Sequence, residues 1–120
     1  MRLYYLASPY SHPDPKVRQA RYEEQGRIAV ELIHKGYHLI APIEMCHHLS
    51  KLHQLPTGYQ YWQARDRLLI ERCDGLIACK MDGWEDSIGM KDEIKYAEFL
   101  DKEVLYYDPN RPKGLELLWM

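Results

Sequence analysis

The sequence has a single phenylalanine, only three cysteines, and no apolar run of the roughly 18 residues that a membrane span needs. Cys46, Cys73 and Cys79 are odd in number and form no Cys-x-x-Cys pair, which argues against a disulfide framework. The first residues also lack a signal-peptide pattern. We therefore expect a reduced, soluble, cytoplasmic protein with no membrane partner.

No stretch concentrates charge of one sign, because 16 basic and 18 acidic residues give a net charge of −2. A protein that follows a nucleic-acid backbone needs a basic face, so a nucleic-acid polymer is not an expected partner. A nucleotide stays open as a small ligand.

The 120 residues are 46% hydrophobic, which suffices for a core and fits one domain over residues 1–120. Ten tyrosines and three tryptophans accompany the lone phenylalanine. Tyrosine and tryptophan rings carry a polar atom and therefore suit partly solvated surfaces such as pockets and subunit interfaces.

Short apolar runs predict strands over residues 3–7, 37–41, 76–79 and 104–107. Helical spacing predicts helices over 15–34, 44–53, 59–72 and 88–100, the first opened by Asp14-Pro15 and the last capped by Ser87. This alternation predicts an α/β fold, with an open, mostly parallel sheet of four or five strands and helices on both faces, flavodoxin-like or Rossmann-like. Ligands of such sheets bind beyond the carboxyl ends of the strands, so residues 8–14, 42–46 and 80–93 should converge there.

Glu93 interrupts an apolar pattern near the expected site. It falls between Ala97 and Leu100 on the apolar face of the last predicted helix, in an early turn. A carboxylate near a helix N-terminus, or one paired with a buried arginine, would explain it without any function.

Asp66 repeats the pattern on the preceding helix, because it shares a stripe with Trp62, Leu69 and Ile70. A buried salt bridge would explain it structurally, with three candidate partners: Arg21, Arg65 and Arg67. Two inward carboxylates beside one cleft also suit glycosyl transfer, whose oxocarbenium-like transition state needs an anion on one side and an acid on the other. Burial raises a carboxyl pKa, which suits one group as nucleophile and the other as proton donor.

Several segments, taken in order, carry a family resemblance. They are Leu3-Tyr4-Tyr5-Leu6-Ala7-Ser8-Pro9, Asp66 with Asp74 at the next strand start, Ser87-Ile88-Gly89 before Glu93, and Ala97 one turn later. Over most of residues 1–108 the chain resembles the nucleoside 2-deoxyribosyltransferase-like superfamily, which includes the 2′-deoxynucleoside 5′-monophosphate N-glycosidases. The residues around Pro9 and Trp84 look most like a small bacterial and phage branch of it.

The resemblance implies a catalytic trio of Glu93, Asp66 and Tyr5. Glu93 would attack the anomeric C1′ of a 2-deoxyribosyl group, Tyr5 would hold Glu93 through a hydrogen bond, and Asp66 would protonate the departing base. Water or a second base would then release the sugar. The implied partner is a small-molecule nucleoside or nucleotide, the implied assembly is a homodimer or higher homo-oligomer, and no metal or organic cofactor is needed.

Ser87 bears on whether the substrate is phosphorylated. The transferases generally carry Asp at this position, facing the sugar hydroxyls, whereas the monophosphate hydrolases carry Ser, which does not repel phosphate. A helix N-terminus also suits phosphate, but plain capping explains Ser87 as well, and a shifted loop could present Asp86 instead. The superfamily's glycine-rich run after the first strand is absent, and Pro9-Tyr10-Ser11-His12 stands there.

Further candidates lie on the loops and the first helix. Arg18 or Arg21 could clamp a 5′-phosphate, and Arg21 could equally pair with Glu24 or Asp66. The rings of Tyr10 and Trp84 lie on predicted loops and could sandwich a base or pack locally. The expected substrate-binding residues are Ser8, Tyr10, His12, Arg21, Trp84, Asp86, Ser87 and Gly89.

Cys46-His47-His48 with His53 fits no usual zinc spacing, so no metal site is expected. Two functions stay open. One is an N-glycosidase or deoxyribosyltransferase with a glutamate nucleophile, and the other is a non-catalytic module of the same fold that binds a nucleotide or an ADP-ribose-like ligand. Convergence of Glu93 and Asp66 on one pocket would favour the enzyme.

Overall fold

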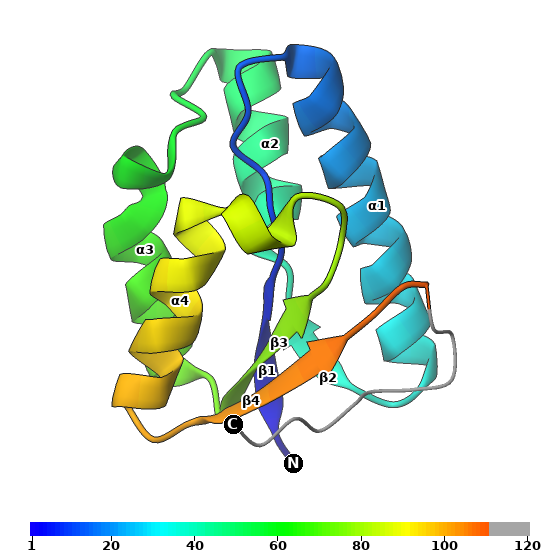
Figure 1. The fold of residues 1–120 in the computed structure, drawn as a ribbon, viewed down its shortest axis with the longest axis vertical. Coiled ribbons are helices and arrows are strands. Elements are labelled where there is room, and N and C mark those ends of the chain that lie inside the picture. The colour runs from blue at the N-terminus through cyan, green and yellow to red at the C-terminus, as the bar shows by residue number, and fades with distance from the viewer. Residues whose placement is uncertain (111–120) are drawn as a thin grey trace.

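The computed structural model describes residues 1–110, which form four strands and four α-helices (Figure 1). Within this range every helix is too short or too polar to cross a membrane. In chain order the elements are β1 (Leu3–Ala7), α1 (Pro15–His34), β2 (His38–Ile40), α2 (Pro42–His53), α3 (Tyr59–Arg72), β3 (Gly75–Cys79), a 3₁₀ turn (Trp84–Asp86), α4 (Ile88–Phe99) and β4 (Glu103–Tyr107).

The four strands form one sheet in the order β2-β1-β3-β4, with all neighbours parallel. This confirms the predicted open parallel α/β sheet, and its strand count is the lower of the two expected. The chain leaves β1 toward β2 and then crosses back to place β3 on the other side of β1. The carboxyl ends of β1 and β3 therefore flank the switch point, where such sheets hold their ligands.

The core has two halves, one on each face of the sheet, because alternate residues of a strand point to opposite sides. Tyr4 and Leu6 of β1 pack with α1, on the right of Figure 1. Tyr5 and Ala7 pack with residues of α3 and α4, on the left. All five residues of β3 are buried, as expected for a central parallel strand covered on both faces. This alternation turns Tyr5 toward the helices that carry Asp66 and Glu93.

The helix starts follow the capping chemistry in the sequence. The Asp14 carboxylate accepts a hydrogen bond from the Lys16 amide at 2.9 Å, with Pro15 at the first helical position, so α1 has the predicted bounds. Ser87 caps α4 in the same way through the Met90 amide at 3.2 Å.

Most boundary differences are one or two residues at the ends of elements. The second strand was predicted over 37–41 and spans only His38–Ile40, and the helix predicted from 44 begins at Pro42. The physical reason is that proline ends a strand and opens a helix equally well, since its missing N–H belongs to the unpaired first turn. The loop predicted over 80–86 also contains the 3₁₀ turn Trp84–Asp86.

Gly75 is fixed by close packing where β3 begins. A Cβ at this position would lie 2.8 Å from Cε1 of Tyr4 and 2.9 Å from the Glu103 carbonyl oxygen. We predict that Gly75→Ala lowers the free energy of unfolding by about 1–3 kcal/mol, because the backbone must shift to relieve the overlap. Denaturant unfolding measures this. Gly58→Ala is the matched control, since a Cβ there meets no atom within 4 Å, and equal losses in the two variants would contradict the packing argument.

Candidate active site

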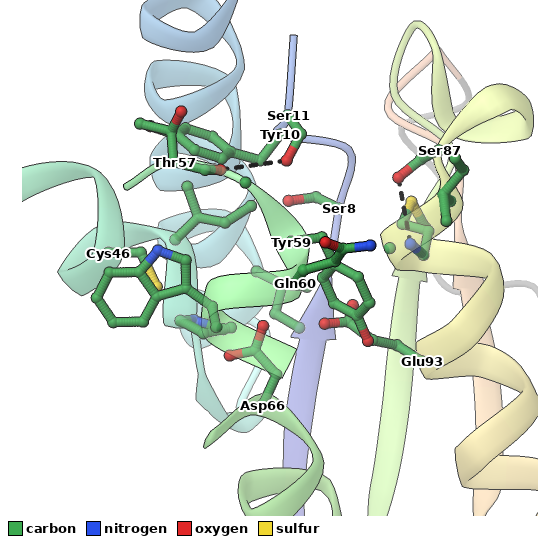
Figure 2. Close-up of a pocket in the computed structure, with 18 of the residues that line it drawn as sticks. Ser8, Tyr10, Ser11, Cys46, Thr57, Tyr59, Gln60, Asp66, Ser87 and Glu93 are labelled. Atoms are coloured by element: carbon green, nitrogen blue, oxygen red, sulfur yellow. Dashed lines mark hydrogen bonds between the residues drawn. The ribbon is translucent and has the colours of Figure 1, made fainter. Parts of the chain in front are cut away.

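A cavity of about 440 Å³ opens at the carboxyl ends of β1 and β3 (Figure 2). The three segments expected to converge all contribute to it, and the loop and first turn of α3 add a fourth side. We call this hollow the active-site pocket. Its lining residues are Tyr5, Leu6, Ser8, Tyr10, Ser11, Pro42, Ile43, Cys46, Thr57, Gly58, Tyr59, Gln60, Trp62, Asp66, Asp86, Ser87, Ile88, Gly89, Met90 and Glu93.

Tyr5, Glu93 and Asp66 meet in this pocket, each from a different element. The Tyr5 hydroxyl donates a hydrogen bond to Glu93 Oε2 at 2.7 Å, although the two residues are 88 positions apart. Asp66 and Glu93 are each only 6% exposed, and each carboxyl group affects the pKa of the other. Figure 2 shows Asp66 projecting from α3 and Glu93 from α4 toward the same space.

The charge on Glu93 has no cationic partner among residues 1–110, where the ion pairs involve other carboxylates. Burial, followed by the neighbouring charge of Asp66, raises the pKa of Glu93 well above its ordinary value. The Tyr5 hydroxyl opposes this rise by donating to the carboxylate. Burial also raises the pKa of Tyr5 itself, so this group remains a neutral donor. The arginine pairing that would explain Glu93 structurally is therefore absent in this part of the chain.

Asp66 does have the cationic partner that was considered for it. Arg65 Nη2 lies 2.8 Å from Asp66 Oδ1 and 2.7 Å from the Cys46 sulfur, which lines the pocket. Burial raises the pKa of Asp66 and the Arg65 guanidinium offsets part of that rise. The site thus holds two buried carboxyl groups, both harder to ionise than normal. Tyr5 donates a hydrogen bond to Glu93, and Arg65 donates one to Asp66. Such a pair keeps one proton between its members over a wide pH range.

Asp92 ties α4 to α3 immediately beside Glu93. Its carboxylate accepts hydrogen bonds from the Tyr59 hydroxyl, from Gln63 Nε2 at 3.3 Å and from Arg67 Nη2 at 2.7 Å, all on α3. These donors lower the pKa of Asp92 against the effect of burial. The contacts fix the face of α4 that carries Glu93 relative to the face of α3 that carries Asp66. We call Asp92 and its three α3 donors the Asp92 clasp.

Five of the eight expected substrate-binding residues line the active-site pocket, namely Ser8, Tyr10, Asp86, Ser87 and Gly89. The Ser8 oxygen accepts a hydrogen bond from the buried Gln25 Nε2 at 2.6 Å, so the Ser8 O–H is left to donate. Ser87 Oγ accepts from the Met90 amide, which is the capping role considered for it. Its O–H likewise stays available.

Three expected residues lie outside the pocket lining. Within residues 1–110, Arg21 neither lines the pocket nor pairs with a carboxylate, and its Nη1 donates to the Ser11 and Tyr10 carbonyls at 3.0 and 3.5 Å. His12 accepts from the Asp14 amide through Nδ1. Trp84 packs edge-on against Tyr106, which is the local packing considered for it. The local hydrogen bonds and contacts of these side chains hold the loops together.

Sequence reasoning missed the α3 wall of the pocket. Tyr59 and Trp62 lie seven and four positions before Asp66, which places all three on one helix face. That spacing was the sequence signal for the α3 wall. Residues on the same helix face as Asp66, and closer to the helix start, must line the same cleft. Trp62 Nε1 donates to the Pro56 carbonyl at 2.8 Å, and the Arg65 guanidinium lies 4.8 Å from its ring centroid.

His47, from the segment weighed as a metal site, makes structural contacts. Its Nδ1 lies 2.7 Å from the Tyr10 hydroxyl, its Nε2 lies 2.8 Å from Gln19 Oε1, and its ring stacks on Tyr22. Both ring nitrogens are therefore engaged. Across residues 1–110 no three His, Cys, Asp or Glu side chains are grouped to hold a metal ion.

A protein-family model matches residues 2–109, a range that includes every residue of the site. The chain belongs to the family described as a domain of unknown function, DUF1937. No curated protein matches it. The matched range of this DUF1937 member contains Tyr5, Asp66 and Glu93.

Asp66 and Glu93, which we call the dyad, make the free energy of unfolding depend on pH. The raised pKa of Glu93 means that, above its ordinary value of 4.5, the folded protein retains a proton that the unfolded chain releases. The free energy of unfolding therefore falls as pH rises through this window. We predict that Glu93→Gln is more thermostable than the native protein, by a margin that grows as the pH is raised above the ordinary glutamate pKa of 4.5. Thermal unfolding at several pH values measures this, with Glu98→Gln on the exposed face of α4 as control. A margin that does not change with pH would contradict the assignment.

The Asp92 clasp predicts an energetic coupling across the two helices. Asp92→Asn and Arg67→Gln should each lower the free energy of unfolding modestly, because the pair is half-exposed but shares several hydrogen bonds. The double variant should lose less than the sum of the two. Hydrogen exchange of the α4 amides gives a local readout. Strict additivity with unchanged α4 exchange would show that the clasp does not hold α4.

Proposed function

We propose that this protein is an N-glycosidase or deoxyribosyltransferase that cleaves the N-glycosidic bond of a 2′-deoxynucleoside 5′-monophosphate or a related nucleoside. The observation that supports this most is the convergence of Glu93, Asp66 and the Tyr5 hydroxyl in one pocket. Two carboxyl groups that share a proton supply the anion and the acid that an oxocarbenium-like transition state requires. The resemblance of the sequence to the deoxyribosyltransferase-like superfamily agrees with this chemistry.

In the proposed reaction, a Glu93 oxygen attacks C1′ as the bond from C1′ to the base nitrogen breaks. The bonding electrons leave with the base, which takes the proton from Asp66. The intermediate is an ester between C1′ and Glu93. A water molecule, or the nitrogen of a second base, then attacks C1′, returns its proton to Asp66 and frees the Glu93 carboxylate. Protons and electrons balance without a further reactant.

The shared proton must lie on Asp66 when the bond breaks. The hydrogen bond from Tyr5 favours this, because it stabilises negative charge on Glu93. Arg65 acts in the opposite sense by stabilising negative charge on Asp66. The contact between the two carboxyl groups raises the pKa of Glu93 and lowers that of Asp66, so the proton rests on Glu93 and must pass to Asp66 before the bond breaks. The two partners thus oppose each other across the dyad, and the proposed reaction uses the state that Tyr5 favours.

The walls of the active-site pocket suit a nucleoside. Ile43, Tyr59 and Trp62 offer apolar and aromatic surface to a planar base. Ser8 and Ser87 offer hydroxyl donors to sugar oxygens. The volume of about 440 Å³ is within the range typical of small-molecule sites.

A non-catalytic binding module is the second candidate. The pairing of Arg65 with Asp66 favours it, because an arginine that stabilises the ionised form of Asp66 opposes its use as a proton donor. This module would bind the same nucleotide or an ADP-ribose-like ligand without turnover.

Free-base release from a panel of deoxynucleosides and their 5′-monophosphates, followed by chromatography, tests the proposal. We expect Glu93→Gln to lower turnover by about 10³-fold or more, because the nucleophile is lost, while ligand binding persists. Asp66→Asn should lower it by about 10²–10⁴-fold, and least for bases that leave without protonation. Glu98→Gln, on the exposed face of the same helix, should match the native protein.

The outcomes separate the two candidates. Full activity in Glu93→Gln would overturn the nucleophile assignment. Saturable ligand binding without base release in the native protein would favour the binding module.

A further inference from the structure

A second hollow of about 420 Å³ lies beside the active-site pocket, between the start of α1 and α2. Tyr10 and Thr57 line both hollows and so form a shared rim. Figure 2 shows these two residues at one end of the active-site pocket and Asp66 at the other. We call the second hollow the basic cleft, and its lining residues are Tyr10, Pro15, Lys16, Arg18, Gln19, His47, Ser50, Lys51 and Thr57.

The two hollows carry opposite charge. Among the described residues, those lining the active-site pocket include three carboxylates, Asp66, Asp86 and Glu93, and no lysine or arginine. Those lining the basic cleft include Lys16, Arg18 and Lys51, and no aspartate or glutamate. Charge therefore changes sign across the rim formed by Tyr10 and Thr57.

The cations of the basic cleft are not neutralised by ion pairs within residues 1–110. Arg18 Nη1 donates to the His12 and Pro13 carbonyls, which orients the guanidinium and leaves its other N–H groups to bind a ligand. Lys51 Nζ donates to the neutral Gln19 side chain at 3.2 Å. The pKa of His47 is lowered by burial and then by Lys51 and Arg18, with Glu23 acting in the opposite sense.

These observations lead to a statement about the substrate. We propose that the basic cleft binds phosphate, so that the substrate is a phosphorylated nucleoside whose sugar lies at Asp66 and Glu93 and whose phosphate crosses the Tyr10–Thr57 rim. This inference rests on the proposed function for the identity of the nucleoside. Phosphate is poorly suited to the active-site pocket, where it would meet Asp86 and the acidic pair of Asp66 and Glu93, whereas lysine and arginine are its usual partners.

The start of α4 at Ser87 suits phosphate less well than the basic cleft does. Ser87 at the start of α4 is flanked by Asp86, and both line the active-site pocket. A phosphate there would be repelled by Asp86 and by the dyad, with no cation in the described lining to compensate. The basic cleft supplies three cations on the opposite side, so Ser87 is left to donate to a neutral sugar oxygen.

The first test is independent of turnover. Inorganic phosphate and pyrophosphate are titrated into the isotopically labelled protein, and the amide resonances of residues 10–19 and 47–57 are followed by NMR. We expect shifts confined to these segments and an affinity at least about tenfold weaker in Lys16→Gln/Lys51→Gln. Lys91→Gln/Lys95→Gln, which removes the same charge from α4, is the matched control. Absence of shifts in these segments, or an equal loss of phosphate affinity in both double variants, would overturn the proposal that the basic cleft binds phosphate.

The second test uses the substrate panel. In Lys16→Gln/Lys51→Gln, KM for a nucleoside 5′-monophosphate or 5′-diphosphate should rise about tenfold or more, while KM for the nucleoside and kcat stay unchanged. A rise for the monophosphate places the first phosphate in the cleft, and a rise for the diphosphate alone places the terminal one there. Equal KM changes for nucleoside and nucleotides would overturn the proposal. If no panel member is cleaved, the proposed function fails, and the phosphate titration still decides the cleft by itself.

Discussion

Burial of two carboxyl groups against each other is the constraint on which this site depends. Glu93 and Asp66 give up water at a cost that only nearby donors and a shared proton can offset. Tyr5 on β1 donates to one carboxyl and Arg65 on α3 to the other. Because the partners come from different elements, the dyad exists only when the sheet and both helices are assembled. Folding and the proposed chemistry therefore depend on the same contacts.

The arrangement around the dyad keeps it rigid and asymmetric. The Asp92 clasp fixes α4 to α3 through Tyr59, whose ring also packs on Gly89, where a Cβ would lie 3.0 Å from Tyr59 Cδ1. Glycine at this position thus lets the aromatic wall approach the start of α4. Tyr59 therefore both shapes the pocket and anchors the helix that carries Glu93. Precise placement of this kind is what a reaction at a single carbon atom requires.

The site also divides its charges between two hollows. Acidic groups gather where a positive charge would develop on the sugar, and cations gather beyond Tyr10 and Thr57. A ligand with a neutral part and an anionic part would match both at once. This segregation cannot be read from the net charge of −2, because opposite charges cancel in a sum over the chain.

The sequence by itself determined the order and most bounds of the elements, since caps such as Asp14 and alternating apolar runs act locally. It also placed Glu93 and Asp66 on inward faces, because helical periodicity is a local property. Only the tertiary structure decided which partners they meet. Arg65 rather than Arg21 pairs with Asp66, since Arg21 is held by loop carbonyls that no periodicity predicts. Pairings between distant segments depend on how helices pack across a sheet, and that packing brings Tyr5 to Glu93 over 88 positions of chain.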